Sequence, residues 1–283
     1  MNKRHAATAA TALALTLTVT ACSSGDDTDS SAGGSTTGLS HIHGLGLADQ
    51  RLYVATHRGV YTPDAKGKPE LVGDSKDDFM GFTVAEDTTF YASGHPSEGG
   101  NKGLIKSTDA GKTWKSLSLA GQSDFHALDY VHDTIYAYDA TNSLLRTSKD
   151  STTWKDGAQL QALDIAVSPE NPGLVLATTA EGVARSTDGG KTFTTGKQPM
   201  MAFLSWSAKD ALYGIDTSGG LNRSADGGGT WKKISTVPGG QPQALTAVDA
   251  NRVLAATQDG VYESKDGGKT FTKRLSVESS GSH

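Results

Sequence analysis

One eight-residue pattern recurs along this chain and constrains its fold more than any other feature. It reads Ser-x-Asp-x-Gly-x-Thr followed by Trp or Phe. Intact copies occupy residues 107–114, 186–193, 224–231 and 264–271, a shortened copy residues 148–154, and a faint copy residues 62–68. The Asp can accept hydrogen bonds within its own turn, and the Gly can adopt positive φ. Each copy therefore predicts a stapled β-hairpin with a structural aspartate. These are Asp109, Asp150, Asp188, Asp226 and Asp266.

An apolar segment precedes each hairpin pattern, and six such segments begin about 40 residues apart. Each is followed by a second β-type run, for example LYVAT at residues 52–56 and TIYAYD at residues 134–139. A third run leads into the hairpin pattern, and a fourth follows it. Four strands in each of six repeats is the arrangement of β-propeller blades. The sequence therefore predicts an all-β, six-bladed β-propeller over residues 39–278.

The hairpin pattern resembles the Asp-box, or BNR repeat, of sialidases and many other β-propellers. Four intact copies make the chain similar to bacterial Asp-box lipoproteins of the kind often called glycosyl hydrolases or exo-alpha-sialidases. It is more distantly similar to the propellers of photosystem assembly factors. The resemblance implies the propeller fold with Asp-box hairpins. It does not imply an activity, because one fold supports many functions.

In a propeller the first strand of each blade lines the central channel, so equivalent positions form rings around it. The expected ring is His43, Met80, His126, Gln161, Met201 and Gln243. None of these side chains is aliphatic. His57 and His95 follow or end second strands, which return to the same face. His41 lies two residues before His43 and therefore points the same way along a strand.

These side chains predict a metal site at the channel mouth. The predicted ligands are His41, His43, His57, Met80, His95, His126 and Met201. Imidazole and thioether donors without a thiolate suit copper. Zinc is the second choice, because it does not need the methionines. Asp78 and Asp124, each two residues before a ring position, are expected as acidic neighbours. The alternative interpretation is a polar channel lining that holds only water.

Two other functions stay open. A glycan-binding or glycoside-hydrolase-like propeller would need a pair of carboxylates about 5–10 Å apart, and the sequence singles out no pair. We expect no sialidase-type site, because Arg146, Arg185 and Arg223 directly precede hairpin patterns and belong on third strands. A protein-interaction or assembly scaffold would need an exposed apolar patch at the rim. Its candidates are Phe79, Phe125, Phe203 and Trp206, which also suit packing between blades.

The N-terminus has the features of a targeting segment. Lys3 and Arg4 precede a short run of apolar and small residues that ends in Val-Thr-Ala-Cys at residues 19–22. This resembles a bacterial lipobox and predicts a lipoprotein signal peptide over residues 1–21, with lipidation of Cys22. The small polar residues 22–38 predict a flexible tether, and residues 279–283 a disordered tail. We therefore expect an extracytoplasmic protein, anchored to the cell membrane by lipid.

The charge balance limits the partners. The formal net charge is −5, and removal of the two leader cations makes it more negative. This charge disfavours nucleic acid as a partner. We expect a monomer that contacts the bacterial membrane through its lipid and delivers metal to, or otherwise binds, another protein.

Overall fold

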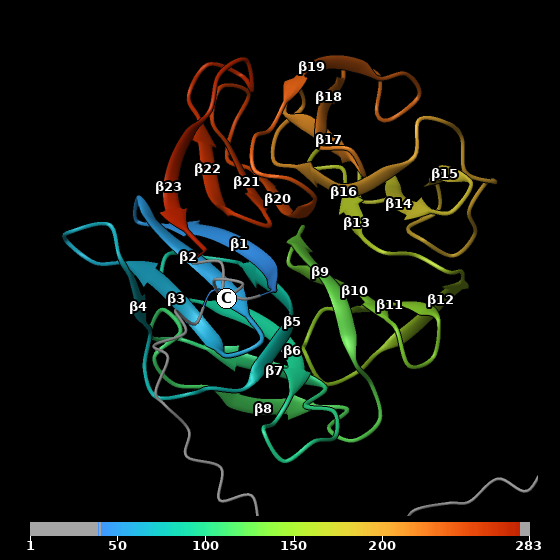
Figure 1. The fold of residues 1–283 in the computed structure, drawn as a ribbon. Coiled ribbons are helices and arrows are strands. Elements are labelled where there is room, and N and C mark those ends of the chain that lie inside the picture. Colours follow the sequence, from blue (N-terminus) through green and yellow to red (C-terminus); the bar gives the residue numbers. More distant parts are fainter. Residues whose placement is uncertain (1–38, 40, 278–283) are drawn as a thin grey trace, which may run out of the picture. The chain divides into compact units, whose positions relative to one another are not determined.

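The computed structural model describes residue 39 and residues 41–277. The predicted signal peptide, Cys22, the tether and the C-terminal tail lie outside the described residues. The described part forms six antiparallel sheets around a central channel (Figure 1). This confirms the predicted all-β, six-bladed β-propeller. Among these residues no helix is long and apolar enough to span a membrane.

Each blade is a meander in which consecutive strands pair antiparallel. Blade one contains β1 (Ile42–Ala48), β2 (Arg51–Thr56), β3 (Gly59–Pro63) and β4 (Pro69–Leu71). Blade two contains β5 (Asp78–Val84), β6 (Phe90–His95), β7 (Leu104–Ser107) and β8 (Lys115–Ser118). Blade three contains β9 (Phe125–Val131), β10 (Thr134–Asp139), β11 (Leu144–Ser148) and β12 (Lys155–Gln159).

Blades five and six repeat this plan. Blade five contains β16 (Met201–Trp206), β17 (Leu212–Asp216), β18 (Gly220–Ser224) and β19 (Lys232–Thr236). Blade six contains β20 (Pro242–Ala247), β21 (Val253–Thr257), β22 (Gly260–Ser264) and β23 (Thr272–Ser276).

Blade four differs from the prediction of four strands in every blade. It contains β13 (Ile165–Val167), β14 (Val175–Thr179) and β15 (Gly182–Ser186). Its fourth strand is reduced to a single bridge between Val183 and Lys197. The segment around that bridge contains Gly196 and Pro199, and a proline has no N–H to donate to a strand ladder.

The hydrophobic core lies between neighbouring blades. Between blades one and two, for example, Tyr53 and Phe90 meet edge to face with their ring centroids 4.8 Å apart. Burial of an aromatic side chain such as Phe90 contributes about 1.5–3 kcal/mol of transfer free energy. Strands that are buried on both sides, such as β10, therefore have continuous apolar runs rather than alternating ones.

The ring closes between blades six and one. Leu45 and Val54 of blade one share a buried cluster with Leu254 of blade six. Two polar contacts cross the same seam: the Ile42 N–H donates to Gln243 Oε1 at 3.1 Å, and Thr246 Oγ1 donates to the Leu45 carbonyl at 2.8 Å. Each blade is contiguous in sequence, so these contacts hold the ring shut.

The Asp-box turns lie at the far end of the third strands. In blade two, Asp109 accepts hydrogen bonds from the Ser107 hydroxyl at 2.7 Å and from the Thr113 N–H at 2.9 Å. The Gly111 N–H donates to Ser107 Oγ at 2.8 Å. The same network recurs at Asp188, Asp226 and Asp266. The shortened copy at Asp150 and the faint one at Asp64 use a subset of these bonds.

A β-bulge near the start of the first strand sets the lining of the channel mouth. In blades one, three, five and six, one residue of the first strand has no partner on the second strand: His43, His126, Ala202 and Gln243, respectively. In blade two the bulge spans Met80 and Gly81. A bulge adds one unpaired residue and re-aims a side chain. The residue just before the bulge, such as Phe79 or Phe125, is buried between blades. These bulges therefore separate core positions from mouth positions.

Candidate metal centre

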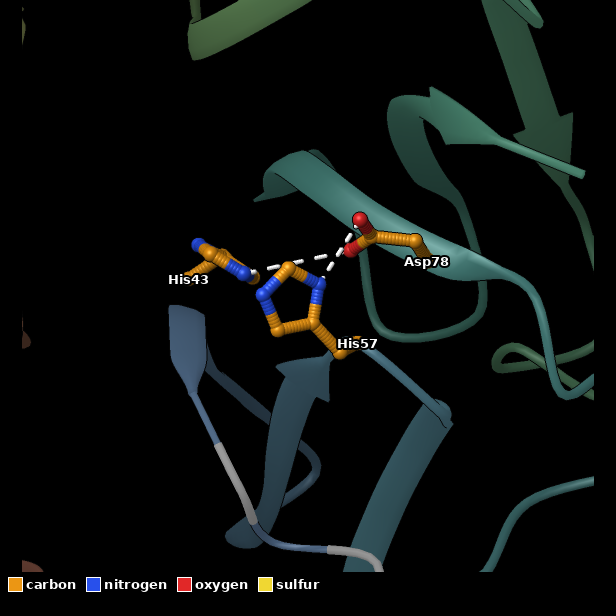
Figure 2. Close-up of side chains that lie close together, drawn as sticks. All are labelled: His43, His57 and Asp78. Carbon is orange, nitrogen blue, oxygen red and sulfur yellow. Dashed lines mark ion pairs between the residues drawn. The ribbon is translucent and has the colours of Figure 1, made fainter. Parts of the chain in front are cut away.

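One group of possible ligands lies at the seam between blades one and two, and we call it the first group. It consists of His43 in β1, His57 directly after β2, and Asp78 at the start of β5 (Figure 2). His57 Nδ1 lies 2.7 Å from Asp78 Oδ2, and His43 Nε2 lies 3.8 Å from Asp78 Oδ1. The carboxylate of blade two thus faces both imidazoles of blade one.

His41 stands at the edge of the first group. Its ring centroid is 4.8 Å from that of His57, and the two rings meet edge to face. The ring of His43 also contacts that of His57, with the two centroids 4.5 Å apart. His41 is exposed and has a φ of 54°. Three imidazoles therefore converge beside one carboxylate.

A second group lies at the seam between blades two and three. It consists of His95 at the end of β6, Asp124 just before β9, and His126 in β9. His126 Nε2 lies 2.6 Å from Asp124 Oδ2, and His95 Nε2 lies 3.4 Å from the same oxygen. In each group, one ligand atom from each residue lies within 4.8 Å of the other two.

The two groups follow one rule of the repeat. In each, a histidine at the end of a second strand faces an aspartate at the beginning of the next blade. The pairs are His57 with Asp78 and His95 with Asp124. The third ligand differs: His43 comes from the earlier blade, whereas His126 comes from the later one.

Several atoms of the two groups are buried without a hydrogen-bond partner. They are His43 Nε2, Asp78 Oδ1 and Asp124 Oδ1. Buried polar atoms are nearly always paired, so an unpaired one needs an explanation. Burial, reinforced by the nearby His57, lowers the pKa of His43 to about 4 even though Asp78 opposes the shift. At neutral pH His43 is therefore uncharged and offers a nitrogen lone pair.

Hydrogen bonds orient the second group. The His95 Nδ1 lies 2.9 Å from the Gly100 carbonyl, which fixes Nδ1 as the protonated nitrogen and leaves Nε2 facing Asp124. A backbone carbonyl in this role is typical of histidines that ligate metals. The hydrogen bond to Asp124 raises the pKa of His126. Protonation of His126 would therefore compete with metal binding at this group.

The methionines divide between the mouth and the core. Met80 is half-buried on β5, two residues after Asp78. Met201 is placed elsewhere than the predicted ring: it is 2 % exposed, packs with Leu204 and Leu212, and its sulfur lies 3.9 Å from Asn222 Nδ2. In the bulge register of blade five, Ala202 holds the mouth position and Met201 the core position before it. Met201 therefore belongs to the core and not to the groups at the mouth.

The two glutamines of the expected ring and His132 lie at three different places in the fold. Gln243, expected in the ring, is the residue skipped in the register of blade six. Gln161 precedes β13, is exposed, and donates to Ser143 Oγ at 2.8 Å, so it is not in the ring. His132, for which the sequence suggested no role, has Nε2 2.9 Å from the Ser168 carbonyl of the next blade.

Behind His43 the first strands enclose a cavity of about 360 Å³. Asp129 and Asp164 line it, and each accepts a hydrogen bond from the next blade: from Val167 N at 2.9 Å and from Leu204 N at 2.8 Å. Burial raises the pKa of Asp129 to about 6 and that of Asp164 to about 7. These two carboxyl groups join neighbouring blades, and neither belongs to the groups at the mouth.

The arginines considered for a sialidase-type site and the aromatic residues considered for a docking patch contact other residues of the fold. Arg146 in β11 pairs with Asp139 and Asp156, and Arg223 in β18 contacts Asp210. Arg185 lies in β15, so all three arginines are on third strands. Phe79 and Phe125 are buried, and Phe203 and Trp206 pack partly buried against core clusters. The exposed large apolar residues of the described part are Leu163 and Met200.

The sequence placed the histidines at the mouth but treated Asp78 and Asp124 only as neighbours. Both prove to be the acidic member of a group. A signal was present in the sequence, since Asp-Phe directly precedes the bulge in both blades. What the sequence did not reveal is that each carboxylate reaches across a seam to a histidine of the preceding blade.

No protein-family model and no curated protein matches this sequence. Solved structures resemble the fold. A GH74 enzyme of Niastella koreensis is 19 % identical, with a TM-score of 0.60 over 85 % of this chain and 46 % of that one. YCF48 bound to a D1 peptide is 18 % identical, with a TM-score of 0.54 over 84 % and 83 % of the two chains.

A streptogramin B lyase is 13 % identical, with a TM-score of 0.59 over 83 % of this chain and 82 % of that one. This chain spans less than half the length of the two GH74 enzymes that it resembles. At such low identities the likeness concerns the fold. The chain is similar to β-propellers whose functions differ from one another, and on this ground it is a β-propeller.

Proposed function

We propose that this propeller binds transition-metal ions at the mouth of its central channel, with copper as the preferred metal and zinc as the second choice. The observation that carries the proposal is the repeated pair of groups, each with two imidazoles and one carboxylate within 4.8 Å. Neutral imidazole and carboxylate donors suit divalent transition metals, among which Cu(II) binds most tightly to a given site.

The electrostatics support this proposal. His43 is kept uncharged, and its buried Nε2 lacks a partner, as does one oxygen of Asp78. An ion at the first group would satisfy both atoms at once. A water-filled lining would not require two imidazoles to converge on a carboxylate at two successive seams.

We also propose that the propeller acts outside the cytoplasm, anchored to the membrane through a lipid on Cys22. The basis is the lipobox-like sequence at residues 19–22. There the propeller would store copper or pass it to a protein partner. Histidine and methionine suit this location, because an exposed free cysteine would oxidise.

The test is metal stoichiometry. Purified protein is exposed separately to Cu(II) and Zn(II), dialysed, and analysed by mass spectrometry for metal per chain. We expect about two copper ions per chain in the wild type and about one in His57→Ala or His95→Ala. His132→Ala is the matched control, because it removes a histidine outside both groups, and it should retain both ions. Wild-type protein without bound metal would overturn the proposal.

A further inference from the structure

Two segments of the mouth have the same local structure but different ligands. In blade two the segment is Asp78-Phe79-Met80, and in blade three it is Asp124-Phe125-His126. The phenylalanine of each contacts the Asp-box tryptophan of its own blade. The ring centroids of Phe79 and Trp114 are 5.0 Å apart, and those of Phe125 and Trp154 are 4.9 Å apart.

The register of the two segments is equally similar. In both strands the bulge begins directly after the phenylalanine, which is 1 % exposed in blade two and 0 % in blade three. With the phenylalanine fixed in the core, the residues on either side of it are directed away from the core. Met80 therefore stands to Asp78 as His126 stands to Asp124.

The counterpart in blade three shows what this position can reach. His126 Nε2 contacts Asp124 Oδ2 at 2.6 Å and so belongs to the second group. Met80 is half-buried, and none of the apolar clusters found among the described residues includes it. Met201, by contrast, is packed inside one of them. Hydrophobic packing thus explains Met201 but not Met80.

We propose that Met80 supplies a thioether ligand to the first group, which makes that group a site for Cu(I), while the second group accepts only nitrogen and oxygen ligation. A thioether is a soft donor that favours Cu(I), whereas Zn(II) gains little from it. The inference rests on the proposed function and deepens it, because it assigns different metal preferences to the two seams.

The experiment measures Cu(I) and Zn(II) affinity of the folded protein by competition with a chromophoric chelator under anaerobic conditions. Met80→Leu keeps the volume and apolar character of the side chain but removes the sulfur. We expect it to weaken Cu(I) binding at the first group by at least about tenfold, as for losses of metal-site contacts generally. Zn(II) affinity should not change. Met200→Leu, at an exposed methionine, is the matched control and should behave as wild type.

X-ray absorption of the Cu(I)-loaded protein provides an independent readout. The wild type should show a sulfur neighbour that Met80→Leu lacks. The reciprocal variant His126→Met, which introduces a thioether at the equivalent position, should add a sulfur neighbour at the second group. This gain of signal does not depend on the stability of Met80→Leu.

The outcomes separate the two proposals. Unchanged Cu(I) affinity in Met80→Leu, or no sulfur neighbour in the wild type, would overturn the role of Met80 while Cu(II) and Zn(II) binding still upheld the metal site. Wild-type protein that binds none of the three ions would overturn the proposed function itself, and the role of Met80 with it.

Discussion

Aspartates at the two ends of the blades differ in how fully their carboxylates are hydrogen-bonded. At the Asp-box turns, Asp109 accepts bonds from Ser107 and from both the N–H and the hydroxyl of Thr113. At the channel mouth, Asp78 and Asp124 each keep one buried oxygen with no hydrogen-bond donor. Repetition of an aspartate therefore does not reveal its role. The satisfied carboxylates hold turns, and the unsatisfied ones are available to an ion.

The pKa values express the same contrast. Hydrogen bonds, led by that from the Thr113 hydroxyl, lower the pKa of Asp109 to about 2. The carboxylate is thus already stabilised by its own turn and gains little from a cation. Inside the channel, burial raises the pKa values of Asp129 and Asp164 instead. The position of an aspartate in the blade thus decides whether hydrogen bonds lower its pKa or burial raises it.

The largest expected effect comes from removing both mouth carboxylates. Asp78→Asn combined with Asp124→Asn should abolish the retention of copper after dialysis, because each group loses its anionic ligand. The free energy of unfolding of the metal-free protein should change by less than about 1 kcal/mol, since Asn keeps the size of the side chain and the partner imidazoles of His57, His95 and His126 are partly exposed. Metal content and urea unfolding check the two parts. A large loss of stability with metal retained would make these aspartates structural, like those of the Asp-boxes.

The next effect concerns the pH dependence of stability. The raised pKa values of Asp129 and Asp164 mean that the folded chain binds more protons than the unfolded chain between about pH 4 and pH 7. Their contribution to stability is fully present below about pH 4 and is lost as the pH rises through 7. Asp164→Asn should therefore lose less stability than wild type between pH 5 and pH 8.

Urea unfolding of the two proteins at both pH values measures this difference. Asp109→Asn, which alters a carboxylate with a lowered pKa, serves as the control and should match the wild-type slope over the same range. If Asp164→Asn and wild type lose equal stability, the channel carboxyls do not titrate in this window.

The smallest effect is expected at a single Asp-box. Asp109→Ala removes the acceptor of the Ser107 and Thr113 hydrogen bonds and should destabilise the fold by about 1–2 kcal/mol, as for the loss of a few partly exposed hydrogen bonds. Metal content should stay at the wild-type level, because the Asp-box turn lies at the opposite end of the blade from the channel mouth. A loss of metal in this variant would mean that the turns and the mouth are coupled through the blade.

The sequence determined the fold through local chemistry. The Ser, Asp, Gly and Thr of each hairpin pattern make their contacts within a few residues of one another, so the pattern predicts its own turn. The spacing of the repeats then fixed six blades, and it placed His43, His57, His95 and His126 at one rim. The prediction of a fourth strand in blade four was wrong. The repeat suggested a strand there, but the segment with Gly196 and Pro199 forms only a single bridge.

The tertiary structure alone decided how the mouth residues are grouped. A bulge shifts the register by one residue, which exchanged Met201 for Ala202 at the mouth of blade five and put the methionine into the core. The seams then brought His57 to Asp78 and His95 to Asp124, pairs formed between neighbouring blades. Periodicity along a chain specifies which face a side chain occupies, but only the packing of one blade against the next specifies which atoms meet there.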